Sequence, residues 1–196
     1  MVRDLDAEEL RALWTLTAEE LKRAGGKRGA NALAFAVLLK FFQVHGRFPR
    51  GRAEIPDEVV RFVAQQVDVT ASDLGFYVWS GRTIERHRAE IRDLLGFREC
   101  SVTDYTAATD WLVQHVTQVE RQVEQVRAEL LGWLRRQHLE PPGSARLIRI
   151  VRSGLDRGER LLIDRICAGL DSTVRDRLNG LVFGVPDEPG RGRNRW

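Results

Sequence analysis

The sequence predicts an all-α protein of two packed helical lobes, the first of which contains a helix-turn-helix-like unit. Apolar residues recur at helical spacing along most of the chain, and no run of alternating β-branched residues indicates a strand. Capping signals and glycines separate one helical stretch from the next. We expect a first lobe over residues 1–100, a second over 101–185, and a disordered basic tail over 186–196.

The first lobe is predicted to begin with two short helices and a central one. The first helix is expected over residues 7–14. Thr17 and Glu20 then match a capping box, which starts a second helix that ends at the glycines 25–26. Residues 31–44 are apolar almost all round. A helix of this kind must be buried on most sides, so we place it at the centre of the lobe.

The rest of the first lobe resembles a DNA-binding arrangement of helices. Residues 45–52 form a basic, glycine-punctuated loop, and Pro56 is suited to a helix N-terminus. A short helix is expected after residue 70 and a longer one over 82–95, closed by Gly96. Helix, short connector, helix, turn and helix is the order of a helix-turn-helix unit or a close variant.

The second lobe is predicted to contain four further helical stretches. Thr103 and Asp104 supply a capping signal for a helix that continues to Val119, and another helix is expected over residues 123–134. The run Pro-Pro-Gly-Ser at 141–144 breaks the chain and caps a helix or helix pair that ends at residue 170. The last helix is expected from residue 171 to about residue 182.

The helix over 82–95 has one face suited to reading DNA. At about 100° per residue, Ile84, Ile91 and His87 fall on one side, and Arg82 and Arg86 fall on the other. Recognition helices present such side chains to base edges, with the helix start close to the backbone. The candidates for base edges of double-stranded DNA are Arg82, Thr83 and Arg86, and Ser80 is a candidate for a phosphate contact. The alternative is a solvated face in which Glu85, Glu90 and Asp93 pair with these cations.

Two further groups of arginines are candidates for contacts to the DNA backbone. Arg47, Arg50 and Arg52 follow one another before the first acid, so we expect them to need a counter-charge from outside. On the helix after residue 144 the wheel places Leu147, Ile148, Val151, Leu155 and Leu162 on one side. The candidates on the other side are Arg146, Arg149 and Arg157. Gly154 and Gly158 could break this helix and disperse the group.

Composition alone does not identify a binder of nucleic acid. The net charge is only +3, and three of the 31 basic residues are lysines, so the others are arginines. Arginine suits phosphates and guanine edges, yet a GC-rich genome would produce the same bias. Cys100 and Cys167 are too far apart in the chain for a cysteine motif, and we expect two reduced thiols in the core.

No pattern in the sequence predicts catalysis. The four histidines have no metal-ligand spacing, and phosphate-binding glycine loops, nucleophile motifs and a carboxylate trio for two-metal chemistry are absent. We therefore expect no catalytic residue, metal, cofactor or small-molecule substrate. The longest apolar-rich stretch, residues 30–44, is too short to span a membrane, and the charged N-terminus does not match a secretory signal. Cytoplasm is the predicted location.

Seven short segments occur in a fixed order along the chain. They are Phe-Ala-Val-Leu-Leu-Lys-Phe-Phe at 35–42, Gly-Arg-Phe-Pro at 46–49, Glu-Ile-Pro at 54–56, Ser-Gly-Arg-Thr at 80–83, His-Arg at 87–88, Gly-Phe-Arg at 96–98 and Glu-Pro-Pro at 140–142. Taken together and in this order, they resemble the N-terminal domain of the Tn-three family of transposases, which are replicative and cointegrate-forming. The resemblance covers roughly residues 9–185. Gly154 and the abrupt tail after Pro186 depart from the family pattern.

The resemblance implies an all-helical module that recognises the terminal inverted repeats of a transposon. It also implies that chemistry belongs to a separate C-terminal RNase-H-like domain with three metal-binding carboxylates, so this chain is expected to be non-catalytic. A second hypothesis is a protein–protein module whose helices over 111–134 pair with full-length transposase or with a second copy, or a regulator that competes for the transposon ends. A third, an independent nuclease, has no motif in its favour.

Overall fold

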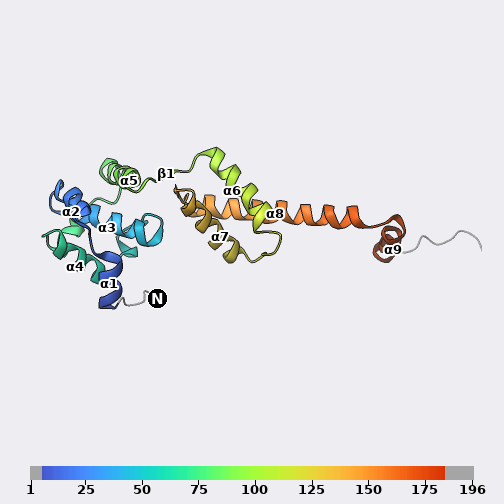
Figure 1. Cartoon of the computed structure of the whole chain (residues 1–196), viewed down its shortest axis with the longest axis horizontal. Helices are drawn as coiled ribbons and strands as arrows, with labels where there is room; N and C mark the ends of the chain where they lie inside the picture. Colours follow the sequence, from blue (N-terminus) through green and yellow to red (C-terminus); the bar gives the residue numbers. More distant parts are fainter. Residues whose placement is uncertain (1–5, 184–196) are drawn as a thin grey trace, which may run out of the picture.

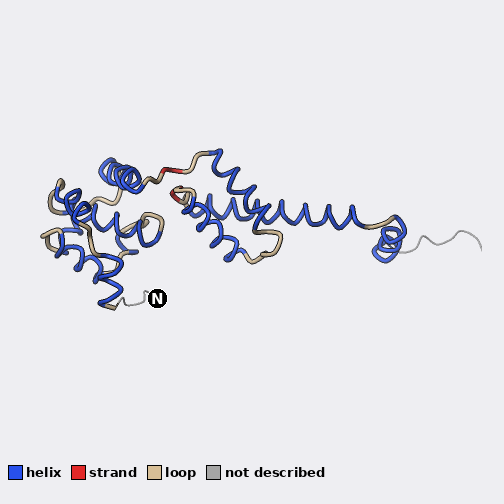
Figure 2. Tube along the Cα trace, viewed as in Figure 1, coloured by secondary structure: helices blue, strands red, loops and turns tan. Residues whose placement is uncertain are grey.

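The structure, a computed structural model, describes residues 6–183 and is built almost entirely of helices (Figures 1 and 2). The predicted all-α class is confirmed. The tail predicted over 186–196 lies outside the described residues. The α-helices are α1 (Ala7–Trp14), α2 (Ala18–Gly25), α3 (Ala30–His45), α4 (Asp57–Gln66), α5 (Arg82–Leu95), α6 (Val102–His115), α7 (Val123–Arg136), α8 (Ser144–Gly169) and α9 (Ser172–Phe183). Two 3-10 helices are η1 (Arg52–Glu54) and η2 (Ala71–Phe76), and two strands are β1 (Arg98–Glu99) and β2 (Leu139–Glu140).

Helix α3 lies at the centre of the first group of helices, as its composition predicts (Figure 1). Every residue from Ala32 to Phe42 is buried, and helices α1, α2, α4, α5 and η2 all pack against α3. The helix ends at Gly46, whose φ of +68° is the left-handed conformation that glycine adopts without strain. We call α1–α5 and their shared buried cluster the first lobe.

A buried ion pair inside the first lobe fixes α2 against α3. Lys40 Nζ lies 3.6 Å from Glu20 Oε2, and both side chains are about nine-tenths buried. Glu20 also accepts a 2.6 Å hydrogen bond from Gln43 Nε2 and caps its own helix by accepting a 2.7 Å bond from the Thr17 amide. A charge inside an apolar core is tolerated when it is paired in this way. The predicted capping box therefore also neutralises the one lysine of α3.

The second lobe, formed by α6, α7 and α8, has its own buried cluster. Its core is built from one face of each helix, and Trp111 stacks on Trp133 at its edge with 5.7 Å between ring centroids. Strands β1 and β2 form a two-residue parallel pair, with Arg98 opposite Leu139, which the sequence patterns do not predict. A domain boundary at residue 100 stays a prediction.

Both ends of α6 differ from the expectation. The capping box of α6 is formed by Ser101 and Asp104, so the helix begins at Val102 and not after Thr103. Helix α6 ends at His115, which leaves Val119 in a turn with 88% of its surface exposed. Of the two alternatives expected after residue 144, the structure has the single continuous helix, over residues 144–169.

Two glycines of α8 pack closely against α6 and the turn that follows it, and they do not break the helix. Gly154 and Gly158 are both buried. A Cβ at Gly154 would lie 3.1 Å from the Leu112 side chain, and a Cβ at Gly158 would lie 2.7 Å from the Thr117 Cβ and overlap its hydroxyl. These two positions therefore need residues without a side chain so that α6 and α8 can approach each other.

Helix α5 is held in one rotation by its buried face. Ile84, His87 and Ile91 are almost fully buried. The hydroxyl of Tyr77 forms a 3.0 Å hydrogen bond with His87 Nδ1, the two rings stack, and Phe35 of α3 meets the imidazole edge-on. Burial, with the charges of Lys27 and Arg86, lowers the pKa of His87 to about 4. The imidazole is therefore neutral at pH 7, and its hydrogen bond with the Tyr77 hydroxyl joins two uncharged groups.

The close approach of α6 and α8 leads to the first prediction. Gly158→Ala should lower the free energy of unfolding by about 1–3 kcal/mol, because the methyl group would overpack the contact with Thr117. Gly169→Ala, in the same helix with open space around it, should leave stability unchanged or raise it by up to about 1 kcal/mol. Urea unfolding followed by circular dichroism measures both. Equal stability of the two variants would contradict the packing argument.

The neutral state of His87 leads to a pH prediction. In the unfolded chain the imidazole binds a proton below its ordinary pKa of 6.5, whereas in the folded chain it does so only near 4. The neutral His87 side chain thus contributes fully to the free energy of unfolding above pH 6.5. As the pH falls from 6.5 to 4, up to about 3 kcal/mol of this free energy is lost. His87→Gln should flatten this part of the pH profile, measured by urea unfolding. His115→Gln, at an exposed site, should keep the wild-type slope; a wild-type slope in His87→Gln would refute the assignment.

Candidate nucleic-acid interface

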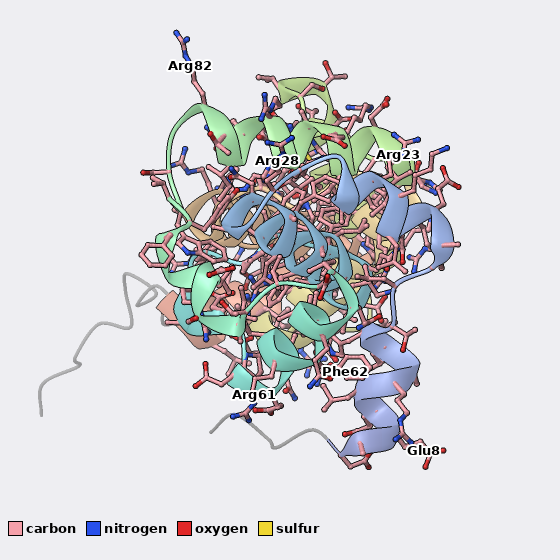
Figure 3. All side chains as sticks on the ribbon, turned by 90° about the vertical axis from the view of Figure 1, so that its left-hand side faces the viewer. Glu8, Arg23, Arg28, Arg61, Phe62 and Arg82 are labelled. Atoms are coloured by element: carbon pink, nitrogen blue, oxygen red, sulfur yellow. The ribbon has the colours of Figure 1, made fainter. Side chains whose placement is uncertain are left out.

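The outer face of α5 carries two arginines without an ion pair in the described part of the chain. Arg82 and Arg86 are exposed and make no ion pair within residues 6–183. Figure 3 shows Arg82 projecting away from the ribbon at the top of the view, on the side of the first lobe opposite Arg61. Ser80 is exposed beside them, and Thr83 is half-buried. Of the residues predicted to contact base edges, the two arginines are thus fully accessible and Thr83 only partly.

Two of the three acids of α5 pair with residues other than Arg82 and Arg86, which bears on the alternative of a neutralised face; the third, Asp93, is exposed and forms no ion pair among the described residues. Glu85 lies 3.2 Å from Arg88, and Glu90 lies 2.9 Å from Lys27 in the turn between α2 and α3. Arg28 follows Lys27 in this turn and is exposed. In Figure 3 it lies on the same side of the first lobe as Arg82. Sequence patterns did not single out Arg28, since a lone cation in a glycine turn carries no periodic signal.

The basic loop is neutralised in part from inside the protein, which corrects the expectation that it needs an external counter-charge. Arg47 lies 2.6 Å and Arg50 lies 3.8 Å from Glu54, and Arg52 pairs with Asp57. Burial opposes ionisation of Glu54, but the hydrogen bond from Arg47 and the two positive charges outweigh it and lower the pKa of this carboxyl. The turn after Gly51, η1, brings the later acids back onto the loop.

The loop does not join Arg82 and Arg86 in one patch. It meets α5 at Arg88, whose guanidinium carbon lies 5.5 Å from the centroid of the Phe48 ring. At about 100° per residue, Arg88 points well away from Arg82 and Arg86. The structure therefore holds two separate cationic regions, the outer face of α5 and the loop.

Arginines also form the junction between the lobes. Arg92 of α5 lies 2.7 Å from Glu99 and 2.7 Å from Glu140. Arg135 of α7 donates a 2.5 Å hydrogen bond to the Gln43 carbonyl of α3. Burial raises the pKa of Glu140 in spite of Arg92, so this carboxylate depends on the guanidinium beside it. Arg50 donates across the junction to Ser144 Oγ at the start of α8.

The arginines of α8 divide into free and paired ones. Arg146, Arg149 and Arg152 are exposed and have no ion pair among the described residues, and Arg146 lies over the Tyr105 ring at 5.1 Å. Arg157 lies 2.8 Å from Asp110 of α6. Arg160 lies 2.9 Å from Asp156. The predicted cationic face thus exists, and its free charges lie in the first half of the helix.

The apolar side of α8 differs from the wheel. Ile150 is buried, whereas Ile148 and Leu162 are each 40% exposed. The wheel misassigned them because α6 and α7 approach α8 from the side of Gly154 and Gly158, which carry no hydrophobic signal. Cys100 is half-buried and Cys167 is exposed, so the expectation of two core thiols was wrong for Cys167.

Other kinds of site find no support in the part of the chain that the structure describes. Within residues 6–183 no three histidine, cysteine or acidic side chains gather closely enough to hold a metal ion. None of the helices described combines the length and apolar character needed to cross a bilayer. Arginines therefore supply the chemistry of the surface: they bind phosphates and carboxylates.

Comparison with known proteins identifies the family. A model described as "Domain of unknown function (DUF4158)" matches residues 1–154. The chain is 24% identical over 156 residues to the transposase for transposon Tn1546 of Enterococcus faecium, which covers 80% of this chain and 16% of that protein. It is 28% identical over 174 residues to the transposase for transposon Tn21 of Escherichia coli, covering 86% and 17%. The transposase for transposon Tn501 of Pseudomonas aeruginosa is 24% identical over 179 residues, covering 89% and 18%.

The chain thus spans about one sixth of the length of these relatives. The matches confirm the resemblance to the Tn-three transposases that the seven sequence segments indicate. Because the family model covers most of the chain, the protein belongs to the DUF4158 family, and it is similar to one part of the transposases named above.

Proposed function

We propose that the chain binds double-stranded DNA as a non-catalytic part of a transposase and recognises the terminal inverted repeats of a transposon. The observation that carries the proposal is the state of α5. Its outer arginines, Arg82 and Arg86, are exposed and unpaired among the described residues, while its acids Glu85 and Glu90 are engaged elsewhere. Unneutralised guanidinium groups on one face of a helix complement a negatively charged groove.

The proposal gives the predicted residues distinct roles. Helix α5 has 14 residues and is therefore about 21 Å long, enough to cross the major groove, which is about 12 Å wide. Arg82 and Arg86, with Thr83 at the edge, would read bases, and α4, η2 and α5 would act as the helix-turn-helix-like unit. The proposed backbone contacts are Ser80, Arg47, Arg50, Arg52, Arg146, Arg149 and Arg157. No cofactor is proposed, and the proposed location is with the DNA in the cytoplasm.

Arginine substitutions on opposite sides of the first lobe test the specificity claim. Arg82→Ala and Arg86→Ala should each weaken binding to a duplex carrying the transposon end by about 1–3 kcal/mol and reduce discrimination against a scrambled duplex. The reason is loss of a bidentate bond to a base edge. Fluorescence anisotropy titrations of both duplexes at one salt concentration give the numbers.

Arg61→Ala is the matched control. Arg61 is exposed, has no ion pair among residues 6–183, and lies at the other end of the lobe in Figure 3. This variant removes the same charge and should keep the discrimination of the wild type. If wild-type protein binds both duplexes equally, or if Arg61→Ala relaxes discrimination as much as Arg82→Ala, recognition through α5 is wrong.

Pairing with a full-length transposase or with a second copy is a second candidate function, favoured by one observation. The end of α8 and helix α9, which Figure 1 shows running beyond α6 and α7, are exposed almost throughout. Their exposed apolar residues are Leu161, Leu162, Ile163, Ile166, Val174, Leu178, Leu181 and Val182. The surface first expected for pairing, over residues 111–134, instead packs its apolar face into the second lobe.

A test of the pairing candidate uses the apolar residues of α8. Ile166→Ser should abolish self-association or co-purification with full-length transposase without DNA, because it places a hydroxyl in an apolar contact. Ser153→Ala, on an exposed part of the same helix, should leave association unchanged. Light scattering coupled to gel filtration measures self-association, and affinity co-purification measures binding to the full-length transposase. A monomer that captures no transposase would eliminate this candidate.

A further inference from the structure

We infer that a cavity between the two lobes is a binding site for a phosphate group of the DNA backbone. The inference rests on the proposed function and adds a site that joins the lobes. The cavity has a volume of about 330 Å³. It is lined by the basic loop, by α5, by α7 and by the segment that leads into α8. Its charged lining residues are Arg47, Arg50, Arg88, Arg127 and Glu140.

The charge inside the cavity is strongly positive. Four guanidinium groups line it against a single carboxylate, and Glu140 already accepts a 2.7 Å hydrogen bond from Arg92. The acids that pair with the four arginines are Glu54, Glu85 and Glu124, and none of them lines the cavity. Glu85 instead lines an adjoining cavity. A ligand in the cavity meets donors and positive charge on several sides.

The start of α8 adds further donors to the arginine cluster. Gly143 and Ser144 line the cavity, and this end of the 26-residue helix has no side-chain cap and no acid in its first turn. The amides of a first turn are free donors, and the helix dipole favours an anion there. Arg50 reaches the same point by donating to Ser144 Oγ. The arginines define the site, and the helix end strengthens it.

The surroundings favour a backbone phosphate over a free anion. The adjoining cavity, of about 350 Å³, shares Arg88, Glu140 and Gly143 and is also lined by Arg92, Arg146, Glu85 and Glu99. Arg92 is paired there with Glu99 and Glu140, so the cation without an ion pair among the described residues is Arg146. From Arg146 the free arginines continue at residues 149 and 152 along exposed α8. A row of cations suits a chain of phosphates, whereas an isolated anion would use only one position. DNA lying along α8 would therefore place one of its phosphates in the cavity.

A phosphate bound here would hold the two lobes in one orientation. Arg47, Arg50 and Arg88 belong to the first lobe, and Arg127 and Ser144 belong to the second. Arginines form hydrogen bonds and ion pairs across this junction. The arginines of the two lobes repel one another, and an anion that accepts hydrogen bonds from both lobes replaces this repulsion with attraction. DNA binding and the relative placement of the lobes thus become coupled.

The experiment compares two arginine variants of equal charge in the full chain. Arg127→Gln removes a cavity guanidinium whose only acid partner among residues 6–183, Glu124, is exposed, so folding is little affected. Arg121→Gln removes an exposed arginine just before the same helix, outside the cavity. Binding to a random-sequence duplex of about 20 base pairs is measured by anisotropy over a range of NaCl concentrations, because phosphate contacts are independent of sequence.

We expect Arg127→Gln to weaken binding about tenfold and to lower the slope of log affinity against log salt by about one, with little change in Arg121→Gln. Equal effects of the two variants would overturn the site while leaving DNA binding intact. Absence of binding by the wild type would instead refute the proposed function. In a second arm, inorganic phosphate is titrated at constant ionic strength and the melting temperature is recorded. Stabilisation that Arg127→Gln abolishes, with duplex affinity unchanged, would assign the cavity to a free anion and overturn the backbone assignment.

Discussion

The burial of α3 on nearly all its sides is the constraint on which the first lobe depends. An apolar helix of 16 residues can be removed from water only if several neighbours each turn an apolar face toward it. Helix α5 meets this demand with Ile84, His87 and Ile91, and its rotation is then fixed. The exposure of Arg82 and Arg86 is a consequence, since they lie opposite the buried face. The cationic surface of α5 is therefore set by the core beneath it.

A different principle governs the contact between the lobes. Each lobe encloses its own apolar cluster, whereas arginine, glutamate and backbone carbonyl groups form much of the junction between them. Apolar contacts are not screened by ions, whereas ion pairs are, and exposed pairs more than buried ones. Arg92 and Glu140 are only 14% and 20% exposed, so ions screen this pair less than the exposed end of the junction, where Arg50 meets Ser144.

Local signals in the sequence predicted the helices well, and contacts between distant segments could not be predicted. Thr17, Glu20 and Gly96 act within one turn of chain, so their capping roles follow from sequence alone. The pairing of Arg47 with Glu54 depends on the turn that η1 makes, and the arginines around Ser144 meet only after the lobes fold. Gly154 and Gly158 were expected to weaken a helix, because propensity describes an isolated helix and cannot include the approach of α6.

The positions of the arginines also bear on whether their number reflects only genome composition. A compositional bias would replace lysine wherever a cation is tolerated, and exposed Arg61 fits that explanation. Arg92 does not, since its two terminal nitrogens each lie 2.7 Å from a different carboxylate, Glu99 and Glu140, a geometry that needs a planar fork. Arg135 likewise spans from α7 to a carbonyl of α3. Where guanidinium groups join the lobes, the geometry of the contacts requires arginine, and composition does not explain it. A phosphate bound at the junction would meet the same planar guanidinium groups.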